Sequence, residues 1–126
     1  ADRVNIFEQF LRGQIRERRP DRIVAAAVSC IRESRGRMRI EDLARRAGLS
    51  QSALERRFRH EVGASPKKFA GIVRLRNVVR LRRTSVSFTE IAHAAGYADQ
   101  SHFIKDFRRF AGQAPEPFFQ SQTAFC

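Results

Sequence analysis

The sequence has few cysteines and no long hydrophobic run. Cys30 and Cys126 are too few for a disulfide framework, which favours a reducing, cytosolic compartment. We read Cys30 as a small core residue. No apolar stretch is long enough to span a bilayer, and no secretory signal peptide is recognisable. These absences argue against a disulfide-stabilised secreted protein and against a membrane-spanning one.

Catalytic and metal-binding patterns are missing as well. His60, His93 and His102 have no metal-ligand spacing with either cysteine. The glycines fall at predicted helix ends, so they form no phosphate-binding loop. Asp99, Ser101 and His102 are too close together on one helix to make a catalytic triad. The sequence therefore predicts no enzyme, no metal and no cofactor.

Lysine is scarce, whereas arginine is abundant. The chain of 126 residues has 3 Lys, 22 Arg and a formal net charge of +12. Arginine binds phosphate with two parallel hydrogen bonds and pairs with guanine edges, so this bias favours nucleic acid. A basic membrane-surface protein would need an apolar helix face free for lipid. Here the apolar stripes are needed for the core.

The stretch 87–119 predicts a helix-turn-helix. Ser87 and Glu90 form a capping box that starts a short helix. Gly96 ends that helix, because a sharp turn uses backbone angles that only glycine adopts at low cost. Asp99 is a good N-cap for a second, longer helix.

The two faces of this second helix differ. Its core-facing stripe consists of Phe103, Phe107 and Phe110. Its opposite, polar and basic face holds Ser101, Lys105 and Arg108. A surface helix with a solvated charged face is the plain alternative to a partner-binding helix.

A repeat favours the partner-binding alternative. The pattern F-R-x3-G-x2-P-x2-F occurs twice, from Phe58 to Phe69 and from Phe107 to Phe118. The first copy belongs to a weaker version of the same plan over residues 40–69. Two helix-turn-helix units in one very basic chain point to double-stranded DNA.

The remaining helices follow from periodicity and capping residues. Predicted helices outside the second unit cover residues 4–19, 21–34, 40–47, 51–62 and 66 to about 83. The helix 51–62 should bury Leu54, Phe58 and Val62. A final short helix should contain Phe118 and Phe119. The fold class is all-α, with about seven helices plus an N-terminal extension helix.

The predicted division has four parts. Residues 1–20 are an extension or linker, 21–65 the first helix-turn-helix subdomain, 66–83 a connecting helix, and 84–126 the second subdomain. A connector of about 18 residues spans about 27 Å, and successive major-groove turns are ~34 Å apart. Two recognition helices on this connector can therefore reach adjacent turns of one DNA face.

The N-terminal segment has two interpretations. Ile6 and Phe10 lie off the stripe of its predicted helix, which suggests a surface that packs on a missing upstream domain. A helix that docks on this domain is the alternative. Since the chain begins with Ala rather than Met, we expect it to be a fragment of a longer protein.

The motifs resemble those of the DNA-binding domain of AraC/XylS-family bacterial transcription regulators. The resemblance rests on IEDLARRAGLSQSALERRFRHEVGASPKKF and FTEIAHAAGYADQSHFIKDFRRFAGQAPEPF. The second segment carries A-x3-G-[FY]-x2-[QS]-x2-F-x3-F, which is typical of that family. The resemblance implies two helix-turn-helix subdomains joined by a long helix. It also implies that the third and sixth helices read two adjacent major-groove segments.

The resemblance and the helix faces together select candidate DNA contacts. Positions that match the family's base-reading ones are Ser52, Glu55, Arg56, Gln100, Ser101, His102 and Lys105. Candidate phosphate contacts are Arg57, Arg59, Lys67, Lys68, Arg108 and Arg109. Glu55 and Arg59 also have the spacing of an ordinary ion pair within a helix.

The expected function is sequence-specific regulation of transcription in the bacterial cytoplasm, at the nucleoid. Expected partners are double-stranded DNA, RNA polymerase and a second copy of the chain bound through a missing N-terminal effector domain, with no membrane partner. A non-specific architectural or RNA-binding protein is one alternative. The DNA-binding module of an enzyme whose chemistry lies upstream is another.

Overall fold

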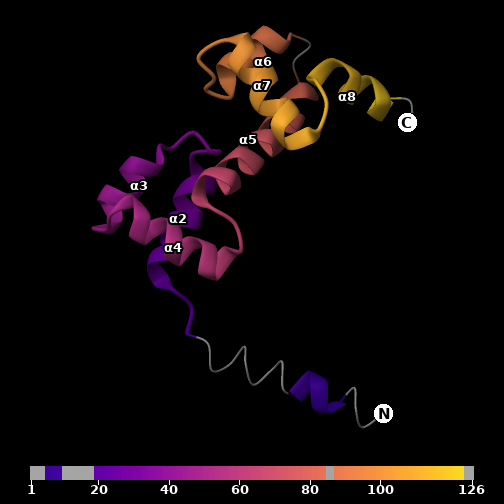
Figure 1. Cartoon of the computed structure of the whole chain (residues 1–126). Coiled ribbons are helices and arrows are strands. Elements are labelled where there is room, and N and C mark those ends of the chain that lie inside the picture. Colours follow the sequence, from indigo (N-terminus) through magenta and orange to yellow (C-terminus); the bar gives the residue numbers. More distant parts are fainter. Residues whose placement is uncertain (1–4, 10–18, 85–86, 124–126) are drawn as a thin grey trace.

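A computed structural model describes residues 5–9, 19–84 and 87–123, and all regular secondary structure in these ranges is helical (Figure 1). The helices are α2 (Arg22–Glu33), α3 (Ile40–Ala47), α4 (Gln51–Val62), α5 (Pro66–Arg82), α6 (Phe88–Ala94), α7 (Gln100–Ala111) and α8 (Pro115–Thr123). The predicted all-α fold, with two helix-turn-helix units joined by a long helix, is confirmed. We call α2–α4 the first unit and α6–α8 the second unit.

Side chains cap the helices that carry the candidate contacts. The Ser50 hydroxyl accepts a hydrogen bond from the Ala53 N–H at 3.1 Å, and Asp99 accepts one from the His102 N–H at 2.7 Å. Ser65 likewise caps α5. These bonds satisfy N–H groups that lack a partner within the helix, so the predicted start of each helix is confirmed.

Each turn uses a glycine in the left-handed region. Gly48 has a φ of 69°, and Gly96 has a φ of 87°. Side chains other than glycine rarely adopt this conformation, so both turns are fixed locally by the sequence.

The buried residues form two separate cores. The first core contains Val24, Ala27, Ile31, Leu43, Ala44, Leu54, Phe58 and Ala70. The second contains Val78, Ile91, Ala92, Ala95, Tyr97, Phe103 and Phe107. Helix α5 contributes to both, because it contacts α2 and α4 in the first unit and α6 and α7 in the second.

Two side chains of the predicted core stripes lie elsewhere. Val62 is 37% exposed rather than buried, because it is the last residue of α4 and its stripe ends beyond the first core. Phe110 is only half-buried, and its ring lies over Gly71 of α5, where a Cβ would overlap it. The small residue on α5 thus lets α7 approach closely.

Aromatic rings close the second core. Phe107 contacts Phe118 with 5.2 Å between ring centroids and Phe119 with 5.7 Å. The predicted final short helix with these two residues is confirmed as α8. Cys30 is also confirmed as a partly buried residue packed against the first core.

The N-terminal segment is described only over residues 5–9, which are helical. Ile6 and Phe7 are 66% and 63% exposed, so this part does not dock on the helical units. Arg19 is not helical, and the other positions of the predicted helix, together with Cys126, lie outside the described residues.

Two glycine substitutions test how the loop before α3 packs on α5. Gly36 has a φ of 76°, and a Cβ there would overlap the Ala70 carbonyl oxygen. Gly48 has a φ of 69° but open space around it. We expect Gly48→Ala to cost about 1–2 kcal/mol from the left-handed backbone alone. Gly36→Ala should cost about 1–3 kcal/mol more, because the methyl group must displace backbone.

Urea denaturation of both variants measures this difference in the free energy of unfolding. Equal losses would show that the loop moves away from α5 without cost.

Candidate nucleic-acid interface

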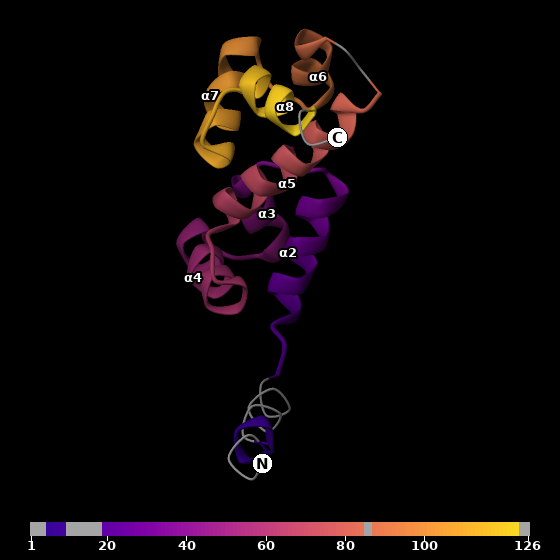
Figure 2. The same ribbon diagram turned by 90° about the vertical axis from the view of Figure 1, so that its right-hand side faces the viewer.

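The two second helices of the helix-turn-helix units lie on one side of the molecule. Figure 2 shows α4 and α7 to the left of α5, while α2 and α6 lie to its right. One extended partner can therefore contact both helices from the same side of the molecule. This arrangement depends on how α5 packs on each unit, which the sequence pattern did not specify.

The outward face of α4 carries its three candidate base-reading residues. Ser52, Glu55 and Arg56 are all exposed. Within the described residues Arg56 has no hydrogen-bond or ion-pair partner, so its guanidinium is free for a ligand. The Glu55 carboxylate pairs with Arg59 at 3.1 Å, as the helical spacing allowed. Both side chains are at least half exposed, so this pair is weak and can open when a partner binds.

The outward face of α7 carries the other four candidate base-reading residues. Gln100, Ser101, His102 and Lys105 are exposed. The Thr89 hydroxyl donates to the side-chain Oε1 atom of Gln100 at 3.4 Å. The His102 ring stands edge-on to Tyr97 with 5.2 Å between centroids. His102 is therefore held against the protein more than its neighbours are.

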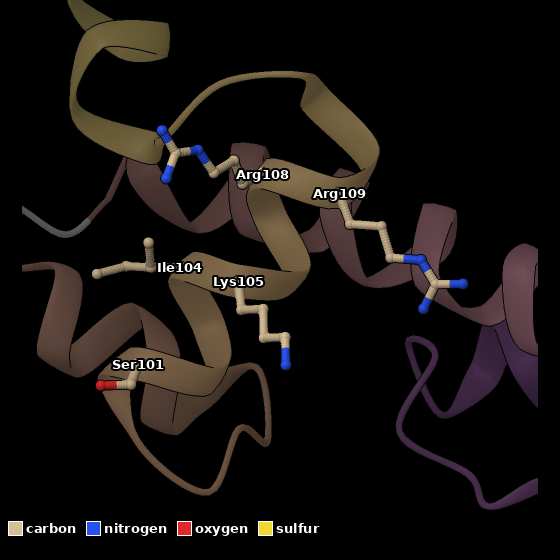
Figure 3. Close-up of a pocket in the computed structure, with 5 residues that line it drawn as sticks. All are labelled: Ser101, Ile104, Lys105, Arg108 and Arg109. Carbon is tan, nitrogen blue, oxygen red and sulfur yellow. The ribbon is translucent and has the colours of Figure 1, made fainter.

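A shallow hollow of about 490 Å³ runs along α7 (Figure 3). It is lined by Ser101, Ile104, Lys105, Arg108 and Arg109. Arg108 and Arg109 extend to opposite sides of the helix, and Arg109 points toward the first unit, drawn in purple. Ile104 adds an apolar surface that the sequence reasoning did not select. Its position beside Ser101 and Lys105 was detectable from the helical period.

The two units share a second groove, of about 360 Å³. Its lining residues are Ile40, Gln51, Glu55, Arg59, Ser65, Pro66, Lys67 and Arg109. Three of its side chains are cationic, and they come from α4, α5 and α7. Such a groove attracts an anion that lies between the two units. The sequence predicted these cations but not that they meet.

Arg57, one of the predicted phosphate contacts, forms an internal ion pair. Its Nε and Nη2 atoms donate to the two carboxylate oxygens of Asp21 at 2.8 and 2.9 Å. Asp21 also accepts from the N–H groups of Ile23 and Val24, so it caps α2. The Arg57 guanidinium holds the pKa of Asp21 below its usual range, and these backbone N–H groups add to the effect. Through these two hydrogen bonds Arg57 fastens α4 to the start of α2.

The remaining predicted phosphate contacts are exposed. Lys67 and Lys68 lie in the first turn of α5, and Arg108 lies in the last turn of α7. The Arg109 guanidinium lies 5.6 Å from the centroid of the Phe110 ring, which steadies its stem.

A polar cluster between the units was not predicted from the sequence. Arg74 of α5 donates to the Asp106 carboxylate of α7 at 3.3 Å, and the Tyr97 hydroxyl donates to the same oxygen at 2.7 Å. No local spacing links these residues, so no signal in one sequence identifies the cluster.

In the part of the chain that the structure describes, no group of three or more His, Cys, Asp or Glu side chains is placed to hold a metal ion. Nor does any described helix combine the length and apolar character needed to cross a membrane.

The fold and its exposed helices define a tandem helix-turn-helix protein. A family model described as "Helix-turn-helix domain" matches residues 43–121, and the chain belongs to that family. A putative AraC-like transcription regulator of Streptomyces lividans is 31% identical over 105 residues, which is 82% of this chain and 34% of that protein. The transcriptional activator RhaS of Pectobacterium carotovorum is 36% identical over 59% of this chain and 27% of its own length.

Solved structures agree with this assignment. The C-terminal domain of AraT, a response regulator from Geobacillus stearothermophilus, has a TM-score of 0.74 at 25% identity, covering 82% of this chain and 88% of that one. The DNA-binding domain of AdpA, a global transcriptional factor solved with a target DNA, has a TM-score of 0.70 at 28% identity, covering 80% and 93%. The resemblance to AraC/XylS DNA-binding domains is confirmed. The chain spans about a third of the length of the curated relatives that it matches.

The Asp21–Arg57 ion pair gives a pH-dependent prediction. Asp21→Asn keeps a good helix cap but removes the charge. Because folding lowers the pKa of Asp21, its stabilisation is complete above the unfolded pKa, about 3.9, and is lost as pH falls through the lower folded value. Wild type should therefore exceed the variant in free energy of unfolding at pH 7, and the gap should shrink in acid.

Urea denaturation across pH measures this gap. Asp42→Asn is the matched control, since its pair with Arg45 is exposed and 3.6 Å long. A gap for Asp21→Asn that persists unchanged in strong acid would contradict the assignment.

Proposed function

We propose that this protein is a sequence-specific, double-stranded DNA-binding transcription regulator that inserts α4 and α7 into adjacent major-groove segments. The observation that carries the proposal is that both capped helices lie on the same side of α5 and carry exposed polar and basic side chains (Figure 2). The likeness to a DNA-binding domain solved with its target supports it.

The length of α5 fits this mode of binding. Its 17 residues span about 26 Å, and the width of a helix on each unit adds to that reach. Successive major-groove segments on one face of DNA are ~34 Å apart. One chain therefore acts as two half-site readers, as a symmetric dimer does with two copies.

The proposed base contacts follow from side-chain chemistry. Arg56 suits the two acceptors of a guanine edge, and the amide of Gln100, which both donates and accepts, suits adenine. Lys105 takes guanine or phosphate, and Glu55 accepts from cytosine N4 once it leaves Arg59. The other three proposed readers are Ser52, Ser101 and His102. Ile104 adds an apolar contact for a thymine methyl group.

The proposed phosphate contacts divide by place. Arg59, Lys67 and Arg109 line the shared groove, where they face the DNA backbone that separates the two major-groove segments. Lys68 and Arg108 lie outside that groove and hold the flanking backbone. These contacts set register and orientation rather than sequence preference.

The properties of the whole protein are further proposals. They comprise an effector domain upstream, a homodimer formed through it, contact with RNA polymerase, and action at the nucleoid of a bacterial cytoplasm. We also keep the division into residues 1–20, 21–65, 66–83 and 84–126. The candidate residues of α4, α5 and α7 are proposed to bind DNA, and no enzymatic step is proposed for them.

Selection of bound duplexes from a random library tests the central proposal. We expect two enriched half-elements about one helical turn apart. Equal binding to scrambled duplex or to RNA, governed by salt alone, would favour an architectural or RNA-binding protein and sink the regulator proposal.

Arg56→Ala tests the first half-element. Loss of a base-reading arginine should relax preference at one position there by about 1–3 kcal/mol and leave the second half-element unchanged. Competition binding on duplexes with each base at that position measures it. Equal weakening on every duplex would show that Arg56 contacts only phosphate.

The salt dependence of binding tests the phosphate contacts. Lys67→Ala should reduce the slope of log affinity against log salt by about one, since one fewer counterion is released. Arg57→Ala is the matched control, because its guanidinium is bound to Asp21 and should leave the slope unchanged. A reduced slope for the Arg57 variant, with its fold intact, would restore Arg57 as a phosphate contact.

A further inference from the structure

Arg74 joins the two units from the middle of α5. Its Nη1 atom donates to the Gly36 carbonyl, in the loop before α3, at 2.7 Å. Its Nε atom donates to the Asp106 carboxylate of α7 at 3.3 Å. One guanidinium thus bonds to the first unit in one direction and to the recognition helix of the second unit in the other.

Two further contacts lie next to the hydrogen bonds of Arg74. The Tyr97 hydroxyl, from the turn before α7, donates to the same Asp106 oxygen at 2.7 Å. The Arg37 side chain of the first unit lies against Gly96, where a Cβ would collide with it. We call Gly36, Arg37, Arg74, Tyr97, Gly96 and Asp106 the inter-unit bracket.

The three side chains that carry the hydrogen bonds of the bracket are largely shielded from water, whereas Arg37 and Gly96 at its edge are exposed. The side chains of Arg74 and Asp106 are 23% and 11% exposed, and Tyr97 is buried. Burial, together with the hydrogen bond to Asp106, raises the pKa of the Tyr97 hydroxyl, so it stays a donor at neutral pH. A charge-assisted bond in such a setting is stronger and more directional than a surface ion pair.

The packing of the two cores does not by itself fix the angle between α4 and α7. Ala70 belongs to the first core and Val78 to the second, about 12 Å further along α5. The buried core of each unit packs on its own half of the helix, and Phe110 of α7 also reaches Gly71 beside the first half. Small changes in either packing therefore alter the angle between α4 and α7. The bracket lies between the halves, where it resists that change.

We propose that Arg74 and Asp106 are positioning residues that set the spacing between the two DNA half-elements. This inference rests on the proposed function, since it concerns how the two readers are held. One inserted base pair shifts the second half-element by ~3.4 Å and turns it by about a tenth of a helical turn. A rigid pair of readers rejects that shift, whereas a loosely held pair follows it.

The mechanism is one of effective concentration. When the first reader is bound, a fixed geometry presents the second reader at its half-element only for one spacing. Loss of the bracket spreads the second reader over several positions. Binding at the preferred spacing then weakens relative to the other spacings, while each half-element read alone is unaffected.

The experiment compares duplexes that carry the selected half-elements at the preferred spacing and with one base pair inserted or removed. The readout is the ratio of affinities at preferred and altered spacing. Asp106→Asn removes the charge, and Arg74→Lys keeps the charge but loses the fork that reaches two partners. We expect each to lower the ratio by about ten-fold, a usual coupling between two sites.

Asp42→Asn is the matched control for charge. Like Asp106→Asn it makes the chain one unit more positive, but it breaks only the exposed pair with Arg45 within one unit. It should keep the wild-type ratio. Binding to a duplex with a single half-element should be the same for all these proteins after allowance for charge.

The outcomes separate this inference from the proposed function. Folded Asp106 and Arg74 variants that keep the wild-type ratio would overturn the inference and leave the regulator proposal standing. Equal weakening on every duplex, including the single half-element, would also overturn it, because the variants would then impair the binding of each half-element and not the spacing between them. A wild type without any preferred duplex would overturn both.

A third variant covers loss of folding. If circular dichroism shows that Asp106→Asn lacks native helix, the test uses Tyr97→Phe together with Arg74→Lys. The Tyr97→Phe variant keeps the aromatic ring and loses only the hydroxyl that donates to Asp106. We expect Tyr97→Phe to lower the ratio in the same direction. An unchanged ratio in both would overturn the inference.

Discussion

The whole arrangement depends on one helix being buried at both ends in different cores. Ala70 and Val78 of α5 lie in the first and second core, respectively, and Gly71 between them lets Phe110 of α7 approach. Burial of apolar area drives each unit onto α5 separately. The helix therefore serves two cores at once, which explains why its apolar residues do not form a single stripe.

Polar contacts then add what apolar packing cannot specify. Packing is non-directional, whereas the bonds of Arg74 to the Gly36 carbonyl and to Asp106 have direction and fixed length. The Asp21–Arg57 pair does the same within the first unit, where it fastens α4 to the start of α2. In both cases an arginine supplies internal structure, so the strongly basic composition overstates the number of cations free for DNA.

Local signals predicted most of the fold. Ser50, Ser65 and Asp99 cap the helices that the pattern assigned to them, and the glycine turns lie where expected. These features depend on residues within a few positions of one another. The ion pair of Arg57 was not predicted for the opposite reason, because its partner Asp21 lies 36 residues away. Val62 was misplaced because a periodic stripe does not reveal where the neighbouring core ends.

By itself the sequence determined the elements, their caps, the two apolar cores and the charged faces of α4 and α7. These follow from helical periodicity and from short-range hydrogen bonds. Only the tertiary structure decided that both helices lie on one side of α5, that Arg59, Lys67 and Arg109 share a groove, and that Arg74 ties the units together. Each of these features involves helices that are far apart in the sequence, and their relative positions depend on the angles at which the helices pack.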